Sequence, residues 1–140
     1  MKNIVFVCTG NTCRSPMAEG IMKKLLKQKG ISDINVSSAG ISSFTGDEVS
    51  TDAVVAVKKF GVDIAEHRAR RINEFILDNT DIFVCMTESH KIALINLGVD
   101  TSKIYCLEVN DPYMMGSEVY ELCATDIKNK LEILFEELVK

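Results

Sequence analysis

The stretch NIVFVCTGNTCRSP, residues 3–16, decides the fold. Residues 3–8 form a short run of mainly β-branched and aromatic side chains without polar alternation, which is typical of a strand buried on both faces. The polar residues 9–14 form a turn. Ser15 suits the N-cap of a helix, and Pro16 suits its first turn, where the missing N–H is not needed. The stretch therefore predicts a buried strand that turns directly into a helix.

Outward from this stretch, strands and helices alternate to the end of the chain. The helix that begins at Ser15 carries an apolar stripe and is expected to end at Gly30. Further strands are expected at residues 34–39, 81–86 and 103–107, and further helices at 52–60, 72–77, 88–97 and 118–139. This alternation predicts right-handed crossovers and a parallel sheet with helices on both faces, a three-layer α/β fold.

The predicted sheet also indicates where a ligand binds. In open parallel sheets, ligands lie beyond the carboxyl ends of the strands. Three polar segments meet that edge, at residues 9–15, 38–46 and 110–116. We therefore expect the functional site to be built from these three segments.

Length and composition exclude several classes of protein. The chain has 140 residues, enough for one core, so we expect one domain over residues 1–140. Its net charge of −4 argues against a scaffold that binds nucleic-acid backbones. No apolar run is long enough to cross a membrane, and the first residues lack the apolar core of a secretory signal. We therefore expect a cytoplasmic protein.

The cysteine pattern fits that compartment. The chain contains Cys8, Cys13, Cys85, Cys106 and Cys123. An odd number of cysteines in a reducing cytoplasm predicts free thiols rather than structural disulfides. A zinc site would need paired cysteines or histidines at short spacing, whereas the chain has no Cys-x-x-Cys and its two histidines lie far apart. We expect no metal site.

The turn after the first strand carries groups suited to phosphate chemistry. Cys8 and Arg14 are separated by five residues, a spacing that is weak alone but stronger at a strand-to-helix turn. Such a turn points successive N–H groups at an anion, and Gly10 supplies a backbone angle that other residues resist. The same dipoles stabilise a thiolate at Cys8. Arg14 can grip two phosphate oxygens, and Ser15 can donate its hydroxyl to the sulfur.

Two alternative roles for this turn are less well supported. A cysteine at the end of a strand is often only a buried side chain. A nucleotide-binding loop would need Gly, four residues and then Gly-Lys-Ser or Gly-Lys-Thr, a run that is absent here. A phosphatase also needs an acid for the leaving group, and Asp111 before Pro112 is the best candidate. The alternative for Asn-Asp-Pro is a plain turn.

Motifs along the whole chain match one known family. VFVCTGNTCRSPMAE spans residues 5–19, and DPY spans residues 111–113. Shorter matches are SAG at 38–40, HRAR at 67–70, and CMT at 85–87 followed by His90. With these motifs the chain resembles the low-molecular-weight protein-tyrosine-phosphatase family. The resemblance implies a doubly wound fold with a four-stranded parallel sheet and a phosphocysteine intermediate.

The resemblance also implies a role for each matching residue. Cys8 is the expected nucleophile, Arg14 the phosphate clamp, and Asp111 the general acid and then base. The phosphate-binding positions are Thr9, Gly10, Asn11, Thr12, Cys13, Arg14 and Ser15. The supporting positions are Ser15, which assists the thiolate, and Asn11, which holds the loop through a network with Ser38 and His67. Cys13 is either a packing residue or the redox partner of Cys8 in a reversible disulfide.

Three residues bear on the substrate. Thr12 stands where tyrosine-directed members usually carry an aliphatic residue, and the loop resembles the bacterial protein-arginine-phosphatase branch more closely. A hydroxyl at this position can contact a guanidinium group, although threonine is also nearly isosteric with valine and isoleucine. Tyr113 instead resembles tyrosine-directed members, and Phe44 is the expected aromatic pocket wall. We expect a phosphoarginine or phosphotyrosine protein substrate, with arginine favoured, and inorganic phosphate as product.

Rival functions are less well supported. Arsenate reduction uses this fold but needs further cysteines as a relay, and none follows Cys85 within the next dozen residues. A phosphate-binding module without turnover would need neither a nucleophile nor an acid. No cofactor or metal is needed for hydrolysis, because Cys8 is the nucleophile and Arg14 with the backbone supplies the positive charge.

Overall fold

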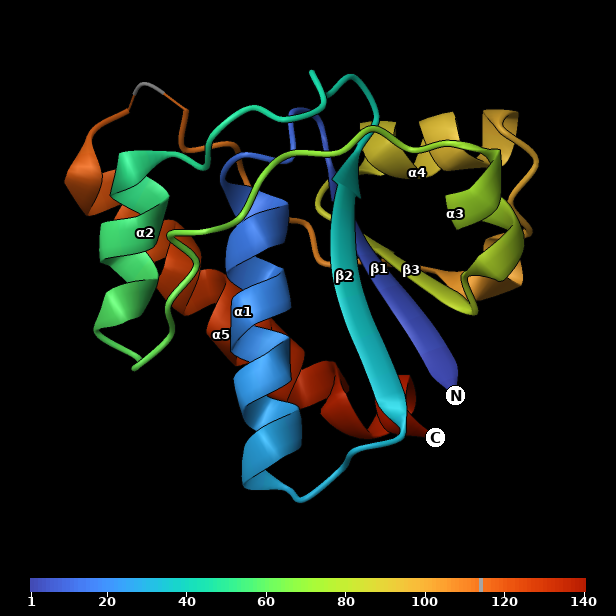
Figure 1. Ribbon diagram of the computed structural model, residues 1–140, viewed down its shortest axis with the longest axis horizontal. Helices are drawn as coiled ribbons and strands as arrows, with labels where there is room; N and C mark the ends of the chain where they lie inside the picture. The colour runs from blue at the N-terminus through green and yellow to red at the C-terminus, as the bar shows by residue number, and fades with distance from the viewer. Residues whose placement is uncertain (114) are drawn as a thin grey trace.

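A four-stranded parallel sheet forms the centre of the computed structural model, which describes residues 1–113 and 115–140 (Figure 1). The strands are β1 (Lys2–Cys8), β2 (Ile34–Gly40), β3 (Ile82–Cys85) and β4 (Ile104–Cys106). Their order in the sheet is β2-β1-β3-β4, and each neighbouring pair is parallel. The predicted parallel sheet is confirmed, with the first strand of the chain inside it.

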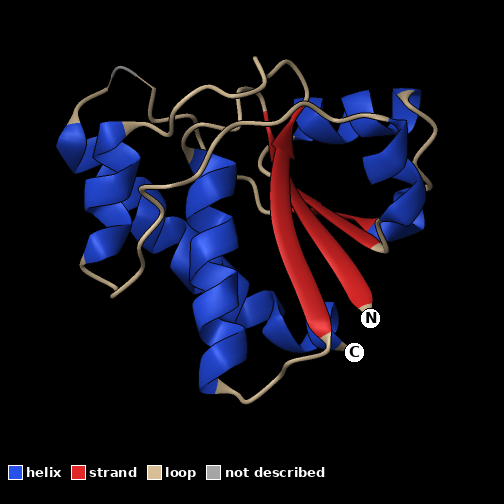
Figure 2. Cartoon of the chain, in the orientation of Figure 1, coloured by secondary structure: helices blue, strands red, loops and turns tan. Residues whose placement is uncertain are grey.

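Helices cover both faces of this sheet (Figure 2). They are α1 (Arg14–Gln28), α2 (Thr51–Lys58), α3 (Glu74–Asn79), α4 (Glu88–Asn96), the short 3₁₀ helix η1 (Thr101–Lys103) and α5 (Ser117–Val139). In Figure 1, α1, α2 and α5 lie on one side of the sheet, and α3 and α4 lie on the other. The three-layer, doubly wound α/β architecture is therefore confirmed.

Strand β1 is apolar on both sides because it faces two separate cores. Its residues Ile4 and Phe6 pack in the core under α1, α2 and α5. The alternate residues Val5 and Val7 pack in the smaller core under α3 and α4. All four are buried, which explains the unbroken apolar run in the sequence.

The start of α1 differs from the prediction. The helix begins at Arg14, with Cys13 at the N-cap position and no side-chain cap. Ser15 is therefore not the N-cap, because its hydroxyl is used inside the loop, 2.9 Å from Cys8 Sγ. Pro16 is the third residue of the helix, where its missing N–H is still not needed. Gly30 follows the helix end with a φ of +69°, as expected of a helix-terminating glycine.

The bounds of the remaining elements lie within two residues of the predicted ones. The largest shift is α3, which was expected at residues 72–77 and begins at Glu74. The reason is Asn73, whose side chain accepts a hydrogen bond from the Ile76 N–H and so caps the helix at this point. Within the described residues, no helix has both the length and the apolar character needed to span a membrane.

The carboxyl end of β2 presses against the turn after β1. Ile41 N donates to the Cys8 carbonyl at 3.0 Å, and Ser42 N donates to the Thr9 carbonyl at 2.9 Å. A Cβ at Gly40 would lie 2.6 Å from the Thr9 carbonyl oxygen, so only glycine permits this approach. The polar segments after β1 and β2 are thereby joined at the edge where the ligand site is expected.

Candidate active site

The Cys8 sulfur lies at the centre of the turn between β1 and α1. Cys8 is buried at the end of β1. Its Sγ accepts a hydrogen bond from the Asn11 N–H at 3.3 Å and lies 2.9 Å from Ser15 Oγ. Hydrogen-bond donors directed at a sulfur stabilise its thiolate form, which is the nucleophilic form.

The unusual backbone angle of this turn lies at Asn11 and not at Gly10, where the sequence had suggested it. Asn11 has a φ of +57°, in the left-handed region, whereas Gly10 is not among the residues with positive φ. Asparagine tolerates this conformation because its short polar side chain can form local hydrogen bonds. The angle turns the Asn11 N–H back toward the Cys8 sulfur.

The Asn11 side chain holds the turn from inside the protein. Its Oδ1 accepts from the Arg70 N–H at 2.9 Å, which identifies Nδ2 as the donor. Nδ2 donates to Ser15 Oγ at 2.8 Å and to Ser38 Oγ at 2.9 Å. Because Ser15 Oγ accepts from Asn11, its own hydrogen is free to point at the Cys8 sulfur. Asn11 is fully buried, so these contacts are shielded from water.

The expected contacts of Ser38 and His67 with Asn11 are present, and they extend to a residue that sequence reasoning missed. His67 Nε2 lies 3.0 Å from the Asn11 carbonyl oxygen, which can only accept, so Nε2 carries the proton. Ser38 Oγ donates to Glu19 Oε1 at 2.6 Å, and His67 Nδ1 lies 3.9 Å from the same oxygen. The Glu19 carboxylate therefore anchors Ser38, one of the groups that hold the turn, and lies near His67 without a hydrogen bond to it.

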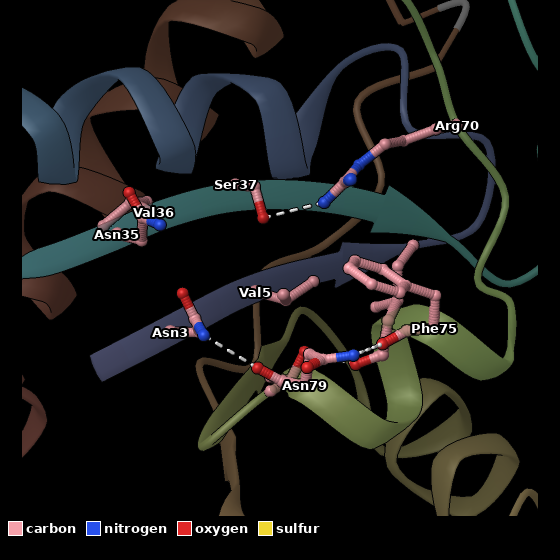
Figure 3. Close-up of a pocket in the computed structure, with 10 residues that line it drawn as sticks. Asn3, Val5, Asn35, Val36, Ser37, Arg70, Phe75 and Asn79 are labelled. Atoms are coloured by element: carbon pink, nitrogen blue, oxygen red, sulfur yellow. Dashed lines mark hydrogen bonds between the residues drawn. The ribbon is translucent and has the colours of Figure 1, made fainter. Parts of the chain in front are cut away.

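Arg70 is a second support that sequence reasoning missed. Its Nε donates to the Ser38 carbonyl at 2.8 Å, and its Nη2 donates to Ser37 Oγ at 2.7 Å. Figure 3 shows this side chain reaching over β2 at one end of a hollow of about 440 Å³, which Phe75 and Asn79 line from the α3 side. Cys8 does not line this hollow. The match of HRAR to the family was the signal that could have identified Arg70.

The Arg14 guanidinium is buried next to the turn. Its Nη1 donates to the Val109 carbonyl at 3.1 Å, and its Nη2 lies 3.6 Å from Asp111 Oδ2. Its Nε is buried and has no hydrogen-bond partner among residues 1–113 and 115–140. A buried charged donor without a partner is costly, and an oxyanion held by the turn would satisfy it.

Asp111 lies on the open side of the site. Half of its side chain is exposed, 51%, compared with 4% for Arg14. Its Oδ1 accepts a hydrogen bond from the Tyr113 N–H at 3.0 Å, which leaves Oδ2 directed toward Arg14. A carboxyl group that is close to the guanidinium and open to water can exchange protons with both a bound ligand and solvent.

His90, for which the sequence suggested no role, fixes the first residue of the turn. His90 Nδ1 accepts from the Thr87 N–H at 3.1 Å, so the neutral ring carries its hydrogen on Nε2. Nε2 lies 2.9 Å from Thr9 Oγ1 and therefore donates to it. Burial, together with the nearby positive charge of Arg14, lowers the pKa of His90 to about 4. The imidazole is thus neutral at physiological pH.

The other predicted site residues lie around the turn. The Thr12 carbonyl accepts from the Ser50 N–H at 2.8 Å, which holds this position against the start of α2. Cys13 is a buried free thiol, and burial, together with the neighbouring Cys8, raises its pKa to about 12. The Phe44 and Tyr113 side chains are 78% and 66% exposed, so neither forms a packed pocket wall. Among the described residues, no three His, Cys, Asp or Glu side chains gather as metal ligands do.

Comparison with known proteins gives a consistent result over the whole chain. The family model for low molecular weight phosphotyrosine protein phosphatase matches residues 3–140. A protein-arginine-phosphatase of Bacillus subtilis is 30% identical to this chain over an alignment 148 residues long, gaps included. The alignment covers 99% of this chain and 97% of that protein.

Solved structures agree with this match. The crystal structure of a low molecular weight protein tyrosine phosphatase from T. tengcongensis superposes with a TM-score of 0.92 at 37% identity, covering 98% of this chain and 99% of that one. An arginine phosphatase variant with a phosphorylated active-site serine superposes with a TM-score of 0.91 at 28% identity, covering 99% and 96%.

Proposed function

We propose that this chain, which belongs to the low molecular weight phosphotyrosine protein phosphatase family, transfers a phosphoryl group from a protein side chain to Cys8 and then to water. The chain is a hydrolase of the protein-phosphatase class. The observation that carries the assignment of residues is the Cys8 sulfur, which receives the Asn11 N–H and faces the Ser15 hydroxyl at 2.9 Å. One domain over residues 1–140 performs both steps.

In the first step, the Cys8 thiolate attacks phosphorus. An S–P bond forms while the bond from phosphorus to the leaving group breaks, and Asp111 gives its proton to that group. In the second step, Asp111 takes a proton from water, the water oxygen bonds to phosphorus, and the S–P bond breaks. Inorganic phosphate leaves, Cys8 returns as a thiolate, and Ser15 eases its departure by hydrogen bonding to it.

Arg14 and the backbone of residues 9–15 hold the phosphoryl oxygens during both steps. The transition state carries negative charge on three equatorial oxygens, and catalysis there depends on positioning and charge stabilisation. Arg14 Nε supports this role, because it is a buried donor next to the turn and has no hydrogen-bond partner among the described residues. The Arg14–Val109 hydrogen bond orients the guanidinium before a ligand arrives.

Phosphoarginine is the favoured substrate. The support is Thr12, whose hydroxyl makes the turn more polar and can contact a guanidinium group. The exposed Phe44 and Tyr113 side chains do not form a closed aromatic slot for a phenyl ring. Tyr113 itself favours the second candidate, phosphotyrosine, because it follows Asp-Pro as in tyrosine-directed members.

We also propose a cytoplasmic location, which the cysteines support. All five are free thiols, which suits a reducing cytoplasm. The reaction as proposed uses no cofactor or metal, since Cys8 and Arg14 supply the nucleophile and the positive charge.

Parallel hydrolysis of phosphoarginine and phosphotyrosine peptides tests the substrate proposal. We expect kcat/KM to be at least tenfold higher for phosphoarginine, a difference of about 1.4 kcal/mol. The Thr12→Ile variant should shift this ratio toward phosphotyrosine, whereas Thr12→Ser, which keeps the hydroxyl, should not. A wild-type preference for phosphotyrosine would overturn the arginine assignment but not the mechanism. A Cys8→Ser variant that still hydrolysed either peptide would overturn the mechanism.

A further inference from the structure

Two cysteines outside the active site lie opposite one another in the sheet. Cys85 at the end of β3 and Cys106 at the end of β4 are register partners in the parallel pair β3–β4. Neighbouring strands are about 4.8 Å apart, so the two Cα atoms are separated by a distance within the range that disulfides span. The sequence separates these residues widely, and only the strand order makes them neighbours.

Both thiols point to the same face of the sheet. Residues that are direct partners in parallel strands share a face, and the surrounding side chains agree with this rule. Phe83 and Cys85 of β3, and Ile104 and Cys106 of β4, all belong to the core under α3 and α4. The intervening residues of both strands contribute to the opposite core. The two sulfurs are therefore on one side, without a strand between them.

The two thiols differ in access to solvent. Cys85 is fully buried, whereas Cys106 is partly exposed at the edge strand. Burial raises the pKa of Cys85, and the adjacent Cys106 raises it further. A buried thiol with a raised pKa is a poor first nucleophile toward a reagent in solution. Cys106 is the thiol that a small molecule can reach, and Cys85 is placed to react next.

We propose that Cys85 and Cys106 form a second dithiol–disulfide couple, separate from Cys8 and Cys13, that small-molecule disulfides of the glutathione class oxidise. The Cys106 thiolate attacks one sulfur of the reagent, forming a mixed disulfide and releasing one small thiolate. Cys85 then gives up its proton and attacks Cys106 Sγ, which releases the second small thiol. The protein loses two electrons and two protons, and the reagent gains them.

This couple lies at the base of the loop that carries Asp111. Leu107 N donates to the Cys85 carbonyl at 2.9 Å, and Val109 N donates to the Met86 carbonyl at 2.7 Å, so β3 and the loop are already paired beyond the cysteines. A covalent bond between Cys85 and Cys106 would tie the loop to β3. Formation of this disulfide requires no large backbone movement, because the two strands are already paired with Cys85 opposite Cys106.

Peptide mapping after incubation of the intact wild-type protein with glutathione disulfide tests the proposal. Trypsin places Cys85 and Cys106 on different peptides, and a Glu-specific protease that cuts after Glu108 separates Cys106 from Cys123. We expect a linked pair of peptides containing Cys85 and Cys106, which separates into two after treatment with a reducing agent. Free thiols at both positions, a lasting glutathione adduct on Cys106, or a Cys106–Cys123 link would each overturn the proposal.

Two matched variants test the order of the steps. Cys85→Ser should accumulate one glutathione on Cys106, because no second thiol displaces it. Cys106→Ser should leave Cys85 unmodified, because Cys85 is fully buried. A Cys106→Ser protein that acquires glutathione on Cys85 as fast as Cys85→Ser does on Cys106 would contradict the assigned order. The wild-type mapping remains decisive if either variant folds poorly.

Discussion

The proposed phosphate-binding turn, residues 9–15, and the proposed acid loop, residues 107–113, lie on two sides of Arg14 but differ in how their polar side chains are held. In the turn, Asn11 and Ser15 are fully buried, and the Asn11 side chain alone makes three hydrogen bonds to protein groups. In the acid loop, Asp111 is 51% exposed, and its backbone neighbour Tyr113 is 66% exposed.

This difference agrees with the role proposed for each region. Groups that stabilise charge in a transition state act best when they are held before the substrate arrives, because no reorganisation is then needed. A group that delivers a proton to a leaving group must be reached by the substrate and by water, so it stands at the open side. Substitutions in the turn are therefore expected to lower both stability and activity, whereas substitution of the exposed Asp111 is expected to lower activity alone.

The largest expected effect comes from removing the sulfur from the turn. In Cys8→Ser, kcat should fall by about 10⁵-fold or more, as for other nucleophile deletions. Binding of inorganic phosphate should remain within about threefold, because Arg14 and the backbone N–H groups are unchanged. Steady-state kinetics and calorimetric titration with phosphate measure the two quantities. Loss of phosphate binding together with activity would mean that the anion site is not preformed.

Asp111→Asn tests the acid loop. We expect kcat on phosphotyrosine peptides to fall by about 10²–10⁴-fold, because the leaving group is no longer protonated. The loss should be smaller with p-nitrophenyl phosphate, whose leaving group needs less protonation. The free energy of unfolding should change by no more than about 0.5 kcal/mol, since the side chain is half exposed. Equal losses on both substrates would argue against an acid role.

Asn11 tests the buried network of the turn. Asn11→Ala leaves Ser38 Oγ, Ser15 Oγ and the Arg70 N–H without this partner, so the free energy of unfolding measured in urea should fall by about 2–4 kcal/mol. Asn11→Gly loses the same hydrogen bonds but fits the φ of +57°, so it should be more stable than Asn11→Ala by about 1 kcal/mol. If the alanine variant is as stable as wild type, the network does not stabilise the fold.

The smallest expected effect concerns His90 and pH. Its folded-state pKa of about 4 lies below its ordinary value of 6.5, so between these values the unfolded chain binds the proton more readily. The stability that His90 contributes is present above pH 6.5 and is lost as the pH falls toward 4, by about 3 kcal/mol. The free energy of unfolding, measured with urea at several pH values across this range, should fall less steeply with decreasing pH in His90→Gln than in the wild type. An unchanged slope would contradict the buried neutral imidazole.

Much of the fold was predictable because its signals are local. The apolar run of β1 and the stripe of α1 are spaced as a buried strand and a helix require. Signals at element boundaries were less reliable, and Ser15 shows why. It has the character of an N-cap, but its hydroxyl faces the Cys8 sulfur instead, and the helix already begins at Arg14. A tertiary contact with the Cys8 sulfur overrode the local preference.

The sequence alone determined the turn proposed as catalytic, since Cys8, Arg14 and the residues between them are continuous in the chain and adopt their geometry at one strand end. It also named Asp111, Ser38 and His67 through their motifs. Only the tertiary structure decided which distant groups support them. The strand order β2-β1-β3-β4 brings β2, with Ser38, against the Cys8 turn on one side and β3 with α4, carrying His90, on the other. Cys85 and Cys106 become neighbours for the same reason, because a sheet pairs strands by position in space and not by separation along the chain.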